Sequence, residues 1–139
     1  MDTGNFKSLL NARSLKATTT RLNLLGHLDQ YGSAMPYSAI QKAMNPVDRV
    51  TLYRTLETLK EQGIIHKAYQ EGSETYYAIC GKQCKEHQHE HDHIHFKCEI
   101  CKVVSCEDLE QEIFISIPKF TINKLSINLE GVCKNCNAK

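Results

Sequence analysis

The chain has 139 residues, which is enough for one ordinary domain or for two very small ones. Hydrophobic residues make up 41% and charged residues 24%, as in globular proteins, and no apolar run is long enough to cross a bilayer, which excludes a membrane-spanning protein. The N-terminus lacks the pattern of an export signal, so we expect a cytoplasmic protein, and the net charge of +1 indicates no particular partner.

The first half of the chain predicts three helices and a β-hairpin. Apolar residues at helical spacing, with capping residues in front and glycine or proline at the ends, predict helices over 18–32, 36–44 and 48–63. Two β-rich runs, 64–69 and 75–79, follow with a glycine-containing loop between them. Three short helices and a two-stranded ribbon are the layout of a winged helix-turn-helix, in which the third helix reads DNA.

The second half predicts a smaller unit of mixed structure. Strands are expected over 91–97 and at 103–104, followed by a helix over 108–117 that Pro118 ends. Two further β-rich segments, 120–122 and 125–129, precede the C-terminal tail. The predicted fold class is therefore α+β, with an N-terminal winged helix-turn-helix DNA-binding domain and a small C-terminal α/β domain.

The two predicted domains, 1–80 and 91–139, differ in charge and in metal-binding side chains. The polar, aperiodic stretch 81–90 predicts a hinge between them. Residues 1–82 hold ten Lys and Arg against seven Asp and Glu, a balance of +3, whereas residues 83–139 hold seven against nine, a balance of −2. All but two of the seven histidines and all but one of the seven cysteines lie in the second part, which the sequence therefore marks as metal-binding.

Two Cys-x-x-Cys pairs predict a structural zinc site formed by Cys98, Cys101, Cys133 and Cys136. Four thiolates satisfy tetrahedral zinc and leave no open position, which is typical of a structural rather than a catalytic site. Such a site would bind the C-terminal tail to the first strand of a domain whose core is small. The alternative is that these cysteines are ordinary core residues.

A histidine tract ahead of the first pair indicates a second metal site. Alternate residues of a strand share one face, so His91, His93 and His95 point the same way and exceed the needs of a single zinc. The remaining candidate ligands are His66 on the wing, Cys80, Cys84, His87, His89 and Cys106. A site of this kind would bridge wing, hinge and C-terminal domain, which suits a switch. The alternative is a solvated histidine-rich loop with adventitious affinity.

Three motifs, in this order, carry a resemblance to a known family. The segments DRVTLYRTL, HDHIHFKCEIC and LEGVCKNC resemble those of the ferric uptake regulator family of bacterial metal-dependent repressors, over a region from about Leu15 to Cys136. The resemblance implies a homodimeric winged-helix DNA-binding protein whose C-terminal domain dimerises and whose regulatory metal sits at the hinge. It also implies that the four paired cysteines are the structural zinc ligands found in many members.

Departures from the family pattern favour zinc over iron. The resemblance implies a histidine at the position of Met35 and an acidic residue at the position of Cys106 in most iron and peroxide sensors of the family. Members with a further metal site commonly have a histidine on the last strand, where this chain has Leu125. These changes remove hard ligands and add a thiolate, and soft ligands favour zinc or another thiophilic ion.

Similarity to the zinc uptake regulators within the family implies the ligands of the regulatory site. Their wing histidine matches His66, and a strand ending in a ligand cysteine matches Cys80. Together with Cys106 and one of two tract histidines these would form a tetrahedral site. The candidates for the tract position are His91 and His93, while His95 and Cys84 are alternative ligands.

The third predicted helix offers the side chains for DNA reading. Leu52, Leu56 and Leu59 form the stripe that packs inward, so residues off this stripe are available to bases or phosphates. The candidates are Arg49, Thr51, Tyr53 and Arg54 on this helix, and Lys16 and Arg21 near the first one for the backbone or minor groove. The alternative is an ordinary solvated helix surface.

These observations predict a zinc-sensing repressor of zinc acquisition genes, with a double-stranded DNA operator and a second copy of the chain as partners. The expected cofactors are a structural Zn²⁺ and a regulatory Zn²⁺, with Fe²⁺ as the alternative in an iron- or peroxide-responsive regulator. A zinc store or chaperone is the alternative of another class. A zinc enzyme with a small-molecule substrate is not expected, because neither the H-E-x-x-H motif nor a deaminase motif occurs.

Overall fold

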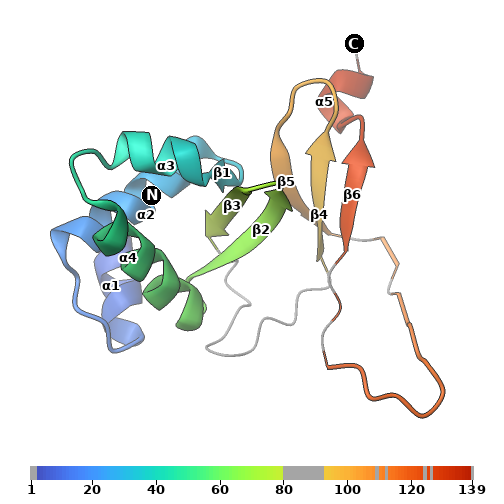
Figure 1. The fold of residues 1–139 in the computed structure, drawn as a ribbon, viewed down its shortest axis with the longest axis horizontal. Coiled ribbons are helices and arrows are strands. Elements are labelled where there is room, and N and C mark those ends of the chain that lie inside the picture. Colours follow the sequence, from blue (N-terminus) through green and yellow to red (C-terminus); the bar gives the residue numbers. More distant parts are fainter. Residues whose placement is uncertain are drawn as a thin grey trace.

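The computed structural model describes residues 3–79, 93–108, 110, 111, 113–123, 125 and 127–138. Figure 1 shows the N-terminal helices at one end, a β-sheet with a short C-terminal helix at the other end and a β-hairpin between them. The elements in this part of the chain are α1 (Thr3–Ala12), α2 (Thr19–Tyr31), β1 (Met35–Pro36), α3 (Tyr37–Ala43), α4 (Arg49–Glu61), β2 (Ile65–Glu71), β3 (Glu74–Ile79), β4 (His93–Cys98), β5 (Val104–Asp108), β6 (Asn128–Gly131) and α5 (Lys134–Asn137).

The helix ends follow the predicted capping residues. The Thr18 side chain accepts a hydrogen bond of 3.2 Å from the backbone N–H of Arg21 at the start of α2, and Gly32 ends that helix at φ 80°. At the start of α4, the Asp48 carboxylate accepts a bond of 3.2 Å from the backbone N–H of Thr51. Hydrogen bonding to the side chain of Thr51, and then to its backbone N–H, holds the pKa of Asp48 below its ordinary value. Gly63, at φ 73°, turns the chain out of α4 into the hairpin.

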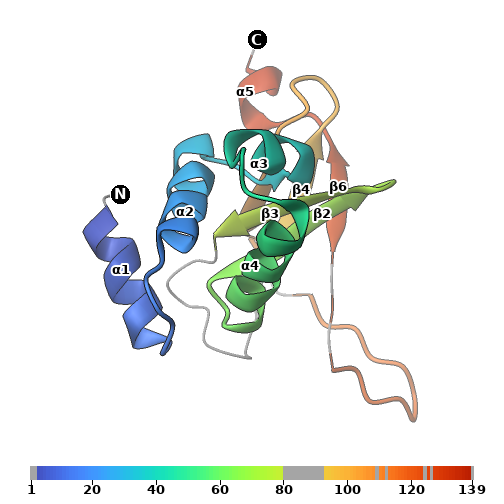
Figure 2. The ribbon, with the colours of Figure 1, turned by 60° about the vertical axis from the view of Figure 1, so that its left-hand side comes forward.

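The helices and one face of the hairpin share the main hydrophobic core. Leu52, Leu56 and Leu59 are fully buried there, as the predicted stripe requires. Met35 belongs to the same core and pairs with Tyr77 of β3, so it packs as a core residue. Figure 2 shows α1 to α4 gathered around this side of the hairpin, which is the wing of the winged helix.

A β-bulge decides which wing residues face the C-terminal domain. In the antiparallel pairing of β2 with β3, His66 lies opposite Ala78 and Tyr69 lies opposite Tyr76, with the irregularity between Lys67 and Tyr69. Alternate residues of β3 share a face, so the extra residue in β2 brings His66 and Tyr69 to the same face despite their odd spacing. One face of the wing therefore packs on the helices, and residues of the other face, such as Tyr69, pack against Val104 of the C-terminal sheet.

The C-terminal sheet has the strand order β5-β4-β6, with β5 antiparallel and β6 parallel to β4. His95 lies opposite Cys106 of β5, and Lys97 lies opposite Val104 of β5 and Glu130 of β6. These five positions share one face of the sheet, because His95 and Lys97 are two residues apart. In Figure 1 the wing crosses beside this sheet.

The structure corrects the predictions for residues 108–129. The predicted helix over 108–117 is wrong, because Asp108 ends β5 and residues 110, 111 and 113–117 contain no helix. Apolar side chains of this segment are not buried against the described part of the chain, so the packing that stabilises most helices is missing: Ile113 is 48% exposed and Phe114 is 88% exposed. No strand forms at 120–122, and the last strand begins at Asn128 rather than Leu125.

Three further elements, α1, β1 and α5, were absent from the predicted set. The predicted hinge at 81–90 lies outside the described residues, so the predicted domain boundaries stay predictions. Among the described helices, none combines the length and the apolar character needed to cross a membrane.

Candidate metal and nucleic-acid sites

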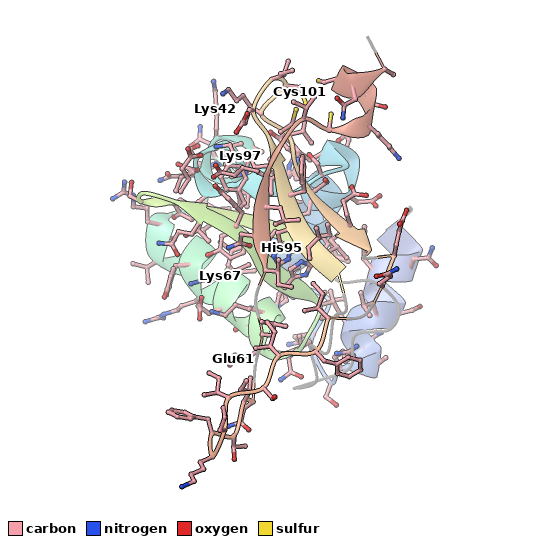
Figure 3. The ribbon with its side chains drawn as sticks, turned by 90° about the vertical axis from the view of Figure 1, so that its right-hand side faces the viewer. Lys42, Glu61, Lys67, His95, Lys97 and Cys101 are labelled. Carbon is pink, nitrogen blue, oxygen red and sulfur yellow. The ribbon has the colours of Figure 1, made fainter. Side chains whose placement is uncertain are left out.

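The first candidate metal site gathers Cys98, Cys101, Cys133 and Cys136, whose sulfur atoms all lie within 4.8 Å of one another. We call these residues the cysteine cluster. Cys98 ends β4 and Cys101 lies in the turn after it, while Cys133 precedes α5 and Cys136 lies within it. The turn and the tail therefore meet at four sulfur atoms, at the end of the sheet where Figure 3 labels Cys101.

The geometry of the cysteine cluster fits zinc. The sulfur atoms of Cys101 and Cys133 are 3.8 Å apart, and bonds of about 2.3 Å to tetrahedral zinc require a separation of about 3.8 Å. The backbone N–H groups of Cys133 and Cys101 point at the buried Cys98 sulfur, at 3.5 and 3.4 Å, and lower the pKa of that thiol to about 6. Hydrogen bonding to the Cys133 sulfur, then burial, and then hydrogen bonding to the Cys98 and Cys101 sulfurs raise the pKa of Cys136 to about 12.

The second candidate site gathers His66 of β2, His95 of β4 and Cys106 of β5, whose donor atoms also lie within 4.8 Å of one another. We call these residues the interdomain cluster. His66 Nε2 is 3.3 Å from Cys106 Sγ, close to the separation of about 3.6 Å that nitrogen and sulfur take on one tetrahedral zinc. The His66 and His95 rings are stacked at 5.3 Å with 28° between their planes. His66 is buried, His95 half-buried and Cys106 exposed.

The structure brings three of the predicted regulatory ligands together. His95, which the sequence treated as an alternative ligand, is the tract histidine whose side chain joins the group. The backbone of His93 is described as the first residue of β4, and Cys80 and His91 lie outside the described residues, as do Cys84, His87 and His89. The register of β4 with β5, which places His95 directly opposite Cys106, would have identified this pair.

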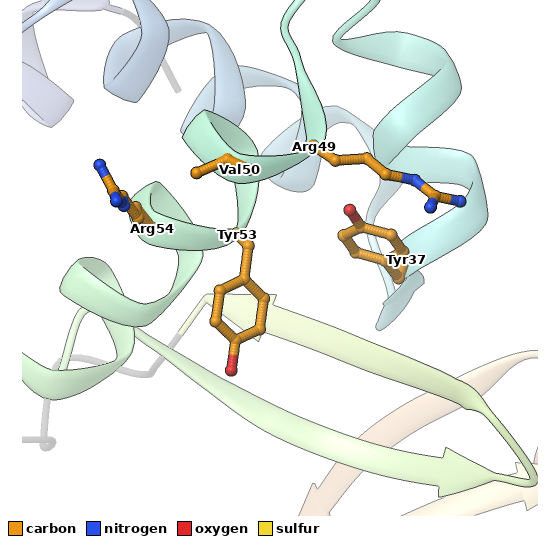
Figure 4. A pocket seen from close by; sticks show the side chains of 5 residues that line it. All are labelled: Tyr37, Arg49, Val50, Tyr53 and Arg54. Carbon is orange, nitrogen blue, oxygen red and sulfur yellow. The ribbon is translucent and has the colours of Figure 1, made fainter.

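Helix α4 is the third helix of the predicted winged helix-turn-helix, and we call it the reader helix. It presents an open hollow with a volume of about 540 Å³ on its solvent side. Three of the predicted DNA contacts line it, namely Arg49, Tyr53 and Arg54, together with two residues that the sequence analysis missed, Tyr37 and Val50 (Figure 4). Val50 and Tyr53 are 57% and 56% exposed, although both are large and apolar or aromatic. Their exposure next to two arginines is the signal that could have identified this surface.

The other three candidates, Lys16, Arg21 and Thr51, do not line this hollow. Thr51 is exposed on α4, and its backbone takes part in the Asp48 cap. Lys16 is exposed, while the half-buried Arg21 donates a bond of 2.9 Å to the backbone carbonyl of Lys16. Arg21 therefore braces the segment that leads into α2.

Known proteins resemble this chain along almost its whole length. The model of the ferric uptake regulator family matches residues 12–132. This chain belongs to the ferric uptake regulator family. It is therefore a metal-responsive, DNA-binding transcription regulator and not an enzyme.

Relatives of this family member include both ferric and zinc regulators. The ferric uptake regulation proteins of Staphylococcus aureus and Staphylococcus epidermidis are each 29% identical to it, over 98% of this chain and 98% and 97% of their own lengths. A solved zinc uptake regulator in complex with zinc and DNA has a TM-score of 0.70 at 22% identity, over 98% of this chain and 93% of its own. The Helicobacter pylori ferric uptake regulator has a TM-score of 0.60 at 16% identity, over 99% and 95%. At these identities the solved structures support the fold alone. The choice of metal must therefore be argued from the ligand atoms of this chain.

Proposed function

We propose that this family member is a zinc-responsive repressor, and that the convergence of His66, His95 and Cys106 from two domains carries its response. The wing supplies one donor of the interdomain cluster and the C-terminal sheet supplies two. When bound, a divalent cation would attract all three donors at once. Closing the cluster thus fixes the wing, and with it the reader helix, relative to the C-terminal domain.

The donor chemistry supports zinc as the metal. Two imidazoles and a thiolate form a soft to borderline set, and no carboxylate belongs to this group in the described part of the chain. Ferrous iron is better served by sites richer in oxygen donors, whereas tetrahedral zinc accepts nitrogen and sulfur. Iron remains the competing proposal because curated relatives are named as ferric regulators.

We propose a separate, structural role for zinc at the cysteine cluster. All four sulfurs come from the C-terminal domain, so closing this cluster holds α5 and the end of β6 on the β4 turn without moving the wing. Four thiolates complete the coordination of zinc, which leaves no position for exchange with another ligand.

The repressor should act as a homodimer on an operator in double-stranded DNA, since members of this family bind DNA and act as dimers. A partner copy would cover the apolar segment 113–125, which leaves Phe114 and Phe120 88% and 71% exposed in the single chain. Two reader helices must then lie about 34 Å apart, or a multiple of this, to meet one face of the duplex. Moving such a dimer from mostly incompetent to mostly competent requires about 5.5 kcal/mol of differential metal affinity.

The experiment that tests the proposal measures operator binding against two metals. A duplex is first selected from a random pool with zinc-loaded protein, and its affinity is then titrated against free zinc and, without oxygen, against ferrous ion. We expect zinc to raise the DNA affinity at least tenfold at a concentration where ferrous ion has little effect. An equal or larger response to ferrous ion would overturn zinc sensing, and the absence of any response would overturn metal control. Sedimentation of the metal-loaded protein as a monomer would overturn the dimer.

A further inference from the structure

The interdomain cluster is one part of a larger contact between the wing and the C-terminal sheet. The bulge in β2 places Tyr69 on the same wing face as His66. On the sheet opposite, Lys97 follows His95 along β4 and Glu130 lies beside Lys97 on β6. In Figure 3, Lys97 lies between His95 and Cys101, which places this part of the contact between the two metal clusters.

Polar contacts cross this interface next to the interdomain cluster. The Tyr69 hydroxyl donates a hydrogen bond of 2.6 Å to the Glu130 carboxylate. The Lys97 ammonium forms an ion pair with Glu71, and only 13% of its side chain is exposed. The same ammonium lies 5.5 and 5.9 Å from the ring centres of Tyr69 and Tyr76, within the range of a cation–π interaction. Each of these contacts joins the wing to the C-terminal sheet.

An apolar layer lies beneath the polar contacts. Ala34, Ala68, Tyr69 and Val104 form a second buried cluster, separate from the main core, with residues from both domains. The backbone N–H of Ala34 donates a hydrogen bond of 2.8 Å to the carbonyl of Val104, which ties the segment before β1 directly to β5. None of these atoms is a metal donor, so the contact does not depend on a metal.

We propose that Tyr69 and Lys97 are positioning residues, which hold the wing on the C-terminal sheet so that His66 faces His95 and Cys106 before metal arrives. This inference rests on the proposed function, because it assigns a role to the same site. The two residues and their carboxylate partners, Glu71 and Glu130, form an interdomain clamp. The clamp reduces the conformational freedom that the metal would otherwise have to remove.

The clamp should control affinity at the interdomain cluster and leave the cysteine cluster unchanged. Apparent affinity falls with the fraction of molecules in which the donors already face one another. If the clamp keeps most metal-free molecules closed, loosening it to about one closed molecule in ten weakens zinc binding there about tenfold. The cysteine cluster lies within one domain and is not affected by this equilibrium.

The test uses variants that remove the polar contacts and keep the side-chain volume. Tyr69→Phe deletes the hydroxyl, Lys97→Met deletes the charge, and the double variant deletes both. Lys67→Met is the matched control for Lys97→Met. Lys67 is an exposed lysine on β2, the strand of Tyr69, and it pairs with Tyr77 on the opposite face of the wing. Lys97→Arg keeps the charge and should rescue the affinity.

Zinc affinity at each cluster is measured by chelator competition without DNA. Small-angle X-ray scattering measures the shape of protein that holds zinc at the cysteine cluster and none at the interdomain cluster. We expect the double variant to bind the second zinc about tenfold more weakly and to be more extended in that half-loaded state. Its absorption spectrum with cobalt in place of zinc should be unchanged at saturation. Lys67→Met should match the wild type in all three measurements. A well-folded double variant with wild-type zinc affinity and wild-type scattering would overturn the clamp.

Failure of the proposed function gives a different result. If wild-type protein shows no zinc-dependent DNA binding but the double variant is more extended, the clamp exists and the proposed metal response does not. If the zinc response is normal and both clamp measurements are unchanged, only the clamp is overturned.

Discussion

The two candidate metal sites differ in how their donors are distributed over the molecule. The cysteine cluster takes all four donors from the C-terminal domain, from a turn and a tail that are already linked through β6. The interdomain cluster takes its three donors from a wing strand and two strands of the C-terminal sheet. Metal at the first site can stabilise only one domain, whereas metal at the second changes the freedom of one domain relative to the other.

Donor type follows the same division. The cysteine cluster has a fully buried sulfur that accepts two backbone N–H groups, as expected of a permanent structural element. The interdomain cluster instead combines two imidazoles with one thiolate, so its described donors do not make the four-thiolate set that completes a structural zinc. The comparison supports the proposed structural role of one site and the proposed regulatory role of the other, and substitutions can separate the two roles.

The largest expected effect comes from breaking the cysteine cluster. Cys133→Ser removes one of four thiolates, and because structural zinc contributes about 10–16 kcal/mol in small zinc domains, the C-terminal domain should unfold or lose its dimer contact. Zinc content and sedimentation measure this loss. A variant that stays a stable dimer with one fewer zinc would contradict the structural assignment.

A smaller, more selective effect is expected from the interdomain cluster. Cys106→Ser should leave the cysteine cluster loaded and the dimer folded, but reduce the effect of zinc on DNA affinity to less than tenfold, since serine is a poor zinc ligand. The control is Ser105→Ala, on the opposite face of β5, where His95 has no partner position. Zinc dependence equal to that of the wild type in Cys106→Ser would remove this residue from the site.

The sequence predicted best those features that depend on local spacing. The α4 helix was predicted from Asp48, Gly63 and a leucine stripe, and the structure confirms all three. The paired cysteines were likewise predicted as a group from their spacing, because each Cys-x-x-Cys turn fixes two ligands locally. In both cases a few neighbouring residues determine the geometry.

Features that depend on strand register could not be predicted in the same way. Strict alternation along β2 would turn Tyr69 away from the face of His66, whereas the bulge adds Tyr69 to that face and so creates the contact with Glu130. Likewise, Ile113 and Ile117 have helical spacing, but each is 48% exposed, so the described residues do not bury them as a packed helix would require. Periodicity indicates which residues need burial and does not identify the surface that buries them.

The smallest expected effect lies outside both clusters, at the N-cap of the reader helix. The hydrogen bonds from Thr51 hold the pKa of Asp48 below its ordinary value of 3.8. The ionised cap therefore stabilises the fold fully above pH 3.8, and this contribution is lost as the pH falls through the lowered pKa. Asp48→Ala should lower the unfolding temperature at pH 7 by less than Cys133→Ser does. The difference from the wild type should shrink in acid, and the ratio of DNA affinities with and without zinc should stay unchanged. A changed ratio would mean that the reader helix itself, and not only its placement by the interdomain cluster, takes part in the metal response.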